Sequence, residues 1–282
     1  MVLPNIKLSQ KALLGSTEEL AINSAHGLAF HRGLGEPLLP SSSTPLTKYL
    51  REYYLEQFSQ VAYAKDNFAL VANGANHSEL SKWANEFFQD SPNSAPSEFP
   101  AIKIEQSKYF GGEERIAHAG GNAVVLGFPG SSSFTGGFWK PEIDVLAALL
   151  GGQSTIKWSP GFSLLGKATA AFPGASISTT SATYSDAGLL YIKLTGEAKD
   201  VGAASKEVVK TIKAVAAGEI SKEDFKKAVA TAKFKALESG QNIAAGIELT
   251  GAGLVHGGKA HQIDEVGKSI DGVSESQLKT VS

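Results

Sequence analysis

The sequence predicts an α+β fold in which helices pack on one face of a mixed, largely antiparallel sheet. Residues 175–186 are polar and β-branched and residues 188–194 are mostly apolar, which indicates an antiparallel pair of strands. The chain beyond residue 200 has the apolar spacing of long helices. Strands followed by long helices are typical of domains built from a sheet layer and a helix layer.

Before residue 89 we expect two helices, a strand and a third helix. The second helix starts near Thr44, and the strand is the short apolar run Phe68–Gly74, which ends at Asn-Gly. The apolar face of the second helix is formed by Leu46, Leu50, Tyr53 and Phe58, and that of the third by Leu80, Trp83, Ala84, Phe87 and Phe88. Residues 89–101 then contain three prolines among serines and acidic residues, which indicates a surface linker.

After this linker the sequence predicts a strand at residues 123–128 and a helix over Pro141–Leu150, with proline in its first turn. Two long helices follow, the first of which ends at Gly218. Ser221 and Asp224 form a capping box that begins the second. The buried faces of these two helices are Val208, Ile212 and Val215, and Phe225, Val229, Ala232 and Ala236.

Composition excludes several classes of function. The chain has 282 residues, a formal net charge of −2 and no cysteine. It therefore lacks the basic field that attracts nucleic acid or an anionic membrane surface, and it lacks thiol chemistry. No apolar run approaches the roughly 20 residues that span a bilayer. The first eleven residues show neither a secretory apolar region nor an arginine-rich amphipathic pattern.

The segment GFSLLGKA nearly matches the phosphate-binding loop G-x-x-x-x-G-K-[ST]. Gly161, Gly166 and Lys167 fit this pattern, but Ala168 replaces the hydroxyl that would bind magnesium. A true phosphate-binding loop follows a buried strand, whereas the preceding sequence GGQSTIKWSP indicates a loop. We therefore expect a structural segment with Gly166 inside a helix, Lys167 on its surface and no bound nucleotide.

The histidines do not have the spacing of a zinc peptidase helix, in which two histidines four residues apart enclose a glutamate. The six are His26, His31, His77, His118, His256 and His261. The two closest pairs are each separated by five residues, which turns the second side chain off the face of the first. Ser185 stands beside Asp186, but no histidine base or oxyanion hole accompanies them, and a turn between strands explains both.

Several segments, in their order and spacing, resemble the pitrilysin-like metallopeptidase family over nearly the whole chain. Before the linker, LGEPLLPSSSTPLTKYL leads to a helix, NFALVANG follows, and another helix begins with HSEL. After it, KYFGGEER, GGQSTIKW, ATYSDAGLLYIK and SKEDFKKAVATAKFKALES follow the layout of the family's second domain. The resemblance implies a two-domain pitrilysin-like metallopeptidase fold. Residues 1–89 would form the second half of an incomplete first domain, residues 90–101 a Ser/Pro linker, and residues 102–282 the second domain.

Within this family, the segments are most similar to the non-catalytic core subunits of fungal mitochondrial ubiquinol–cytochrome c reductase, respiratory complex III. The similarity implies a structural subunit on the matrix side of the inner membrane, paired with a homologous subunit of the core protein 1 type. The respiratory cofactors then belong to other subunits, so no cofactor is expected here. The alternative is the non-catalytic, presequence-binding subunit of a mitochondrial processing peptidase. The longer glycine-rich loop of that subunit corresponds here to GGQSTIKWSP, which has fewer glycines and contains Trp158.

Active members of the family carry the zinc motif H-x-x-E-H, which is absent from this sequence. No catalytic, metal-binding or cofactor-binding residue is therefore carried over from the family, and we expect no enzyme activity from the chain itself. No strand follows the helix expected near Ser274, and the first domain starts beyond its first half. We thus expect a chain that is incomplete at both ends and that associates when it is made alone.

Overall fold

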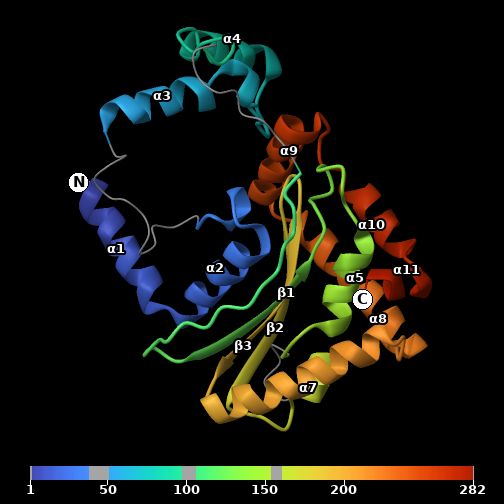
Figure 1. Ribbon diagram of the computed structural model, residues 1–282. Coiled ribbons are helices and arrows are strands. Elements are labelled where there is room, and N and C mark those ends of the chain that lie inside the picture. Colours follow the sequence, from blue (N-terminus) through green and yellow to red (C-terminus); the bar gives the residue numbers. More distant parts are fainter. Residues whose placement is uncertain (1, 38–50, 97–105, 154–160, 282) are drawn as a thin grey trace.

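The computed structural model describes residues 2–37, 51–96, 106–153 and 161–281. At its centre lies a sheet of β1 (Asn122–Pro129), β2 (Ala175–Thr183) and β3 (Gly188–Gly196), in the order β1–β3–β2 (Figure 1). Both neighbouring pairs are antiparallel. The strand expected at residues 123–128 and the antiparallel pair expected after residue 175 are therefore confirmed.

The central strand β3 buries side chains on both faces of the sheet. Leu190, Ile192 and Leu194 belong to the large core cluster, whereas Leu189 and Tyr191 lie in a second, smaller cluster. Successive side chains of a strand point to opposite faces. The two clusters therefore occupy opposite faces of one sheet.

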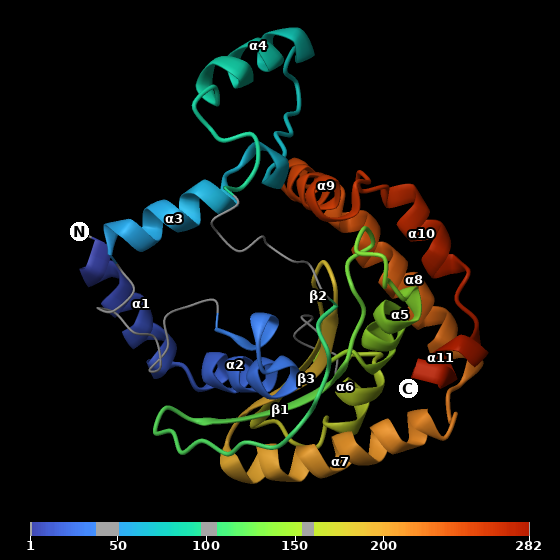
Figure 2. The same ribbon diagram turned by 45° about the horizontal axis from the view of Figure 1, so that its top comes forward.

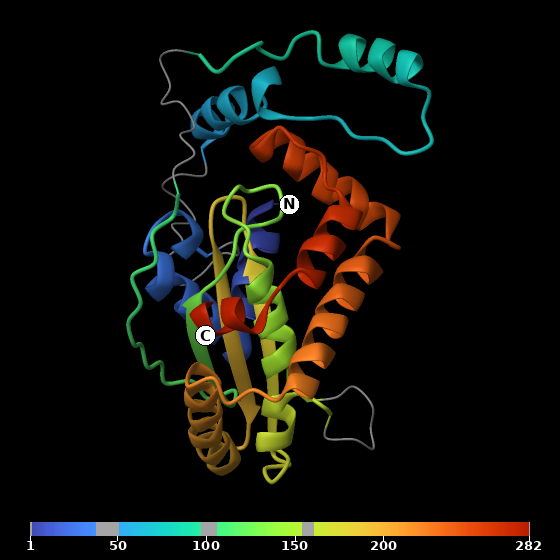
Figure 3. The same cartoon turned by 90° about the vertical axis from the view of Figure 1, so that its right-hand side faces the viewer.

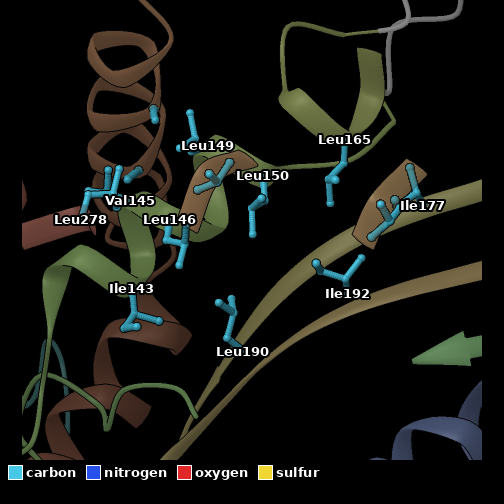
Figure 4. Packing of buried hydrophobic residues seen from close by; sticks show 14 of the residues in the cluster. Ile143, Val145, Leu146, Leu149, Leu150, Leu165, Ile177, Leu190, Ile192 and Leu278 are labelled. Atoms are coloured by element: carbon cyan, nitrogen blue, oxygen red, sulfur yellow. The ribbon is translucent and has the colours of Figure 1, made fainter. Parts of the chain in front are cut away.

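The large core lies between the sheet and a layer of helices. These helices are α5 (Pro141–Leu150), α6 (Leu164–Ala168), α7 (Ala198–Ala216), α8 (Lys222–Ser239), α10 (Ile263–Asp271) and α11 (Glu275–Val281). Figure 4 shows leucines of α5 gathered in one cluster with Ile177 of β2 and with Leu190 and Ile192 of β3, and Figure 3 shows α5, in yellow-green, in front of the strands. As predicted, Pro141 opens α5 and Ser221 caps α8, with Ser221 Oγ accepting a 3.0 Å hydrogen bond from Asp224 N.

The opposite face of the sheet is covered by α2 (Thr17–Phe30), which corrects the expectation that helices cover one face only. Phe30 of α2 is buried in the same cluster as Leu189 of β3. Figures 1 and 2 show α2 on the side of the sheet away from α5. The preceding helix, α1 (Val2–Gly15), packs against α2. The apolar residues on the second face of β3 require this cover, because an uncovered face would leave Leu189 in water.

Residues 51–96 extend away from the sheet layers, beside α9 (Ile243–Gly257), in Figures 1 to 3. They contain α3 (Glu52–Ala62), the short 3-10 helix η2 (Lys65–Asn67) and α4 (His77–Phe87), and a further 3-10 helix, η1 (Gly33–Gly35), follows α2. The helix that begins at HSEL is confirmed, whereas the start expected near Thr44 lies outside the described residues.

The strand predicted at Phe68–Gly74 is wrong. This segment is not part of the sheet, and Leu70 is 51% exposed. An apolar run forms a strand only where a neighbouring strand pairs with its backbone. In the described part of the chain no strand lies beside this segment.

Candidate functional site

Two histidines use both ring nitrogens in hydrogen bonds and link the N-terminal helices to the rest of the fold. His26 Nδ1 lies 2.9 Å from Ile22 O and its Nε2 lies 2.7 Å from the Tyr184 hydroxyl. A carbonyl oxygen only accepts, so Nδ1 donates to Ile22 and Nε2 accepts from Tyr184. Burial, and then the neighbouring Tyr191, raises the pKa of Tyr184, which keeps its proton available for this bond.

His118 is used in the same way. Its Nε2 donates to Leu14 O at 2.8 Å, so its Nδ1 accepts from Thr17 Oγ1 at 2.6 Å. A histidine binds a metal through an unprotonated ring nitrogen. His26 and His118 would each have to lose a hydrogen bond between chain segments before they could act as ligands.

The other histidines lie in separate places. His31 ends α2 and contacts the Phe110 ring edge-on, with 4.6 Å between centroids. His261 contacts Phe134 at 5.7 Å, and burial lowers the pKa of this imidazole. His77 begins α4, and His256 lies in the last turn of α9. In the ranges that the structure describes, no three histidine, aspartate or glutamate side chains come together as a metal site.

The segment that resembles a phosphate-binding loop is structural in its described part. Residues 164–168 form the short helix α6, whose N-terminus is capped by Ser163. Gly166 is buried within α6, as predicted. Lys167 Nζ lies on the surface, 3.1 Å from Asp224 Oδ1 of α8. Residues 154–160, on which the expectation of a preceding loop rests, lie outside the described residues.

Ser185 and Asp186 lie in the turn between β2 and β3, where the sequence placed them. Asp186 Oδ2 accepts hydrogen bonds from Ser107 N at 2.8 Å and from Ser107 Oγ at 2.7 Å. The carboxylate therefore anchors the segment that enters β1. This use of Asp186 is structural.

Several aromatic side chains on α3 and α4 are exposed, and we call this set of residues the aromatic surface. It consists of Tyr53, Tyr54, Phe58, Trp83 and Phe87. Phe58 is 66% exposed and Phe87 is 75% exposed, and the rings of Trp83 and Phe87 stack with 5.9 Å between centroids. Large apolar side chains gathered on one segment usually mark a site of protein contact.

The sequence predicted the apolar periodicity of these helices, and for the helix over Leu80–Phe88 it led us to expect aromatic residues that are only partly covered. Trp83 of α4 is 50% exposed, in line with that expectation. Periodicity shows that a helix has an apolar face, whereas it does not show which surface covers that face.

The fold defines an α+β domain of the peptidase-like class, with an antiparallel sheet between helices. Residues 52–232 match the family model described as "Peptidase M16 inactive domain". The chain thus belongs to the peptidase M16 family, and the pitrilysin-like resemblance of the sequence is confirmed. None of the described helices has the length and apolar character needed to cross a membrane.

The similar proteins are mitochondrial. The chain is 46% identical over 263 residues to "Cytochrome b-c1 complex subunit 2, mitochondrial" of Neurospora crassa, which covers 93% of this chain and 57% of that protein. The subunit of the same name from Schizosaccharomyces pombe is 31% identical over 242 residues, covering 84% of this chain and 53% of that protein. The chain therefore spans little more than half the length of these relatives.

Two further similarities complete the comparison. "Mitochondrial-processing peptidase subunit alpha-2" of Dictyostelium discoideum is 25% identical over 269 residues, covering 92% of this chain and 57% of that protein. A chain in the solved structure "Complex III2 from Candida albicans, Inz-5 bound" superposes with a TM-score of 0.75 at 15% identity, covering 99% of this chain and 66% of the other. This superposition confirms the fold.

Proposed function

We propose that this chain acts as a non-catalytic structural subunit of mitochondrial ubiquinol–cytochrome c reductase, respiratory complex III, of the core protein 2 type. The observation that carries the proposal is the 46% identity to the Neurospora crassa subunit 2 over 93% of this chain. The match to a family model described as inactive, and the absence of H-x-x-E-H from the sequence, support a role without catalysis.

In this proposal the chain pairs with a homologous subunit of the core protein 1 type and lies on the matrix side of the inner membrane. The aromatic surface is then buried against protein in the assembled complex. Burial of a large aromatic side chain contributes about 1.5–3 kcal/mol, so leaving several of them in water is unfavourable. The division into residues 1–89, linker 90–101 and residues 102–282, and the lack of any catalytic, metal or cofactor residue, remain part of the proposal.

The test is affinity purification of the tagged chain from detergent-solubilised mitochondria of the source organism. We expect it to bring down a complex with the absorbance of b-type and c-type haem. The double variant Trp83→Ala/Phe87→Ala should lower the haem recovered per tagged chain. The matched control is Phe234→Ala, because Phe234 on α8 is also 63% exposed but lies outside the aromatic surface. Recovery without haem would contradict the proposal.

The second candidate is the presequence-binding subunit of a mitochondrial processing peptidase. The similarity to the Dictyostelium discoideum alpha-2 subunit, which extends over 92% of this chain, favours it. In that case the same purification yields a soluble heterodimer with a zinc-bearing partner and no haem. The lower identity, 25% against 46%, places this candidate second.

A further inference from the structure

A cavity of about 430 Å³, partly open to solvent, lies between β2, the loop before α5, and helices α5, α8, α9 and α10. Its wall combines apolar residues, among them Ala147, Ala148, Ala232 and Ala236, with hydroxyl-bearing residues of β2 and of the loop before α5. Its size falls in the usual range for pockets that hold small molecules, about 300–1,000 Å³. Neither the sequence patterns nor the proposed function accounts for this cavity.

A carboxylate from α5, that of Asp144, lines the cavity. Asp144 Oδ2 accepts one hydrogen bond of 3.3 Å from Trp139 Nε1, and no described lysine or arginine pairs with this carboxylate. An ionised carboxylate accepts up to about four hydrogen bonds. Burial raises the pKa of Asp144 although hydrogen bonds from Trp139 and Ser181 lower it, so these two bonds do not fully compensate the loss of water around the charged form.

The wall of the cavity also contains the hydroxyl of Ser181 of β2. A side-chain hydrogen bond from Ser181 lowers the pKa of Asp144, so this hydroxyl is directed at the carboxyl group. Apart from Asp144, the buried Ser181 Oγ has no hydrogen-bond partner among the described residues, so its lone pairs can accept a further hydrogen bond. Ser181 pairs with Leu190 across the sheet, on the face that carries the large core. A buried hydroxyl oxygen whose lone pairs lack a donor is unfavourable, so a donor that enters the cavity would be favoured at this position.

The other charged and titratable groups around the cavity do not supply a counter-ion. Burial lowers the pKa of His261, which disfavours the charged imidazolium. Lys235 of α8 lines the cavity but is an exposed residue. Lys259 Nζ is occupied elsewhere, 3.0 Å from Glu265 Oε2 and 4.2 Å from the ring centre of Phe134. Glu142, on the same helix as Asp144, adds a second negative charge and also raises the pKa of Asp144.

We propose that this cavity binds a small organic molecule with a primary ammonium group and an apolar body. The ammonium group donates hydrogen bonds to the Asp144 carboxylate and to Ser181 Oγ, and the alanine-rich wall holds the apolar body. An ammonium group supplies both the missing donors and the missing positive charge. A neutral alcohol of the same shape lacks the positive charge, and an anionic carboxylate lacks both the charge and the donors. The cavity therefore discriminates between these molecules by charge.

The test uses the intact chain and three probes of nearly equal size: 2-phenylethylammonium, 2-phenylethanol and phenylacetate. Binding is followed by the indole N–H signal of Trp139 in a ¹H–¹⁵N spectrum, which the Trp139→Phe variant identifies. We expect the ammonium probe to shift this signal in a saturable way and to bind roughly tenfold or more tightly than 2-phenylethanol. A tenfold ratio corresponds to about 1.4 kcal/mol, the scale of a hydrogen bond to a charged group.

Two variants keep the shape of the cavity and remove one partner each. Asp144→Asn should abolish the preference for ammonium over alcohol, and Ser181→Ala should weaken ammonium binding several-fold. Asp264→Asn is the matched control, because it removes an exposed carboxylate of α10 that neither lines the cavity nor contributes to the pKa shift of Asp144. Equal binding of alcohol and ammonium, equal binding to Asp144→Asn, tighter binding of phenylacetate, or no shift at millimolar ammonium would each overturn the proposal.

Discussion

The packing of α2 on the second face of the sheet is best tested by Phe30→Ala. Phe30 is 4% exposed and is clustered with Leu189, which is fully buried. Truncating a buried phenylalanine to alanine costs about 3–5 kcal/mol, because apolar contact is lost and a cavity remains. Since α2 covers an otherwise open face and can move outward to close part of that cavity, we expect the lower end, about 3 kcal/mol. For a domain with roughly 5–15 kcal/mol of stability this is a large loss.

The assay is equilibrium urea unfolding, followed by far-ultraviolet circular dichroism and by tryptophan fluorescence, at concentrations where light scattering shows no association. We expect the unfolding midpoints recorded by the two probes to move together to a lower urea concentration. The control is Phe87→Ala, whose side chain is 75% exposed and which should change stability by less than about 0.5 kcal/mol. A Phe30→Ala protein as stable as the parent, or separate transitions for the two probes, would refute the packing of α2 on the sheet.

Four further outcomes follow from the described contacts and from the sequence. Lys167→Ala breaks a surface ion pair and should cost less than about 1 kcal/mol, and no ATP-dependent rise in melting temperature should be seen with either protein. Dialysed chain should hold no stoichiometric zinc in elemental analysis, and one zinc per chain would overturn the structural role of the histidines. Limited proteolysis should cut first between residues 89 and 100, at the Ser/Pro linker, and leave the larger C-terminal piece. Because burial raises the pKa of Asp144 above its ordinary value of 3.8, its ionisation costs stability as pH rises through the folded-state pKa. Asp144→Asn should therefore be more stable than the parent at neutral pH in urea unfolding, and this advantage should vanish below about pH 3.8.

Elements with strong local signals could be predicted from the sequence. Proline at the first turn of α5 and the Ser221–Asp224 capping box of α8 set helix starts that the structure reproduces. The strand pair around Tyr184 was predicted for the same reason, since its polar, β-branched strand and its apolar strand flank a short turn. In each case the deciding interactions lie within a few residues along the chain.

Features that depend on distant segments could not be predicted in this way. The apolar run at Phe68–Gly74 looks like a strand, but only a partner strand could have made it one. The placement of α2 depends on contacts between residues 30 and 189, which no local pattern encodes. The cavity was missed for the same reason, because Asp144 and Ser181 come from a helix and a strand 37 positions apart, and each looks ordinary in its own segment.

The contacts of the N-terminal helices restrict the position of the segment that carries the aromatic surface. Before the excursion of residues 51–96, α2 is held on the sheet by Phe30 and by the hydrogen bond of His26 to Tyr184. After it, the chain returns to the same structure, with Phe110 N donating to Ala29 O at 2.8 Å. The nearest described anchors before and after the excursion, Phe30 and Phe110, are thus held on one side of one sheet. Because the excursion is tethered to the sheet at both of these points, its position is restricted before it meets a partner, which lowers the entropy that binding must overcome. Loosening α2 with Phe30→Ala should therefore weaken recovery of the complex even though Phe30 lies outside the aromatic surface.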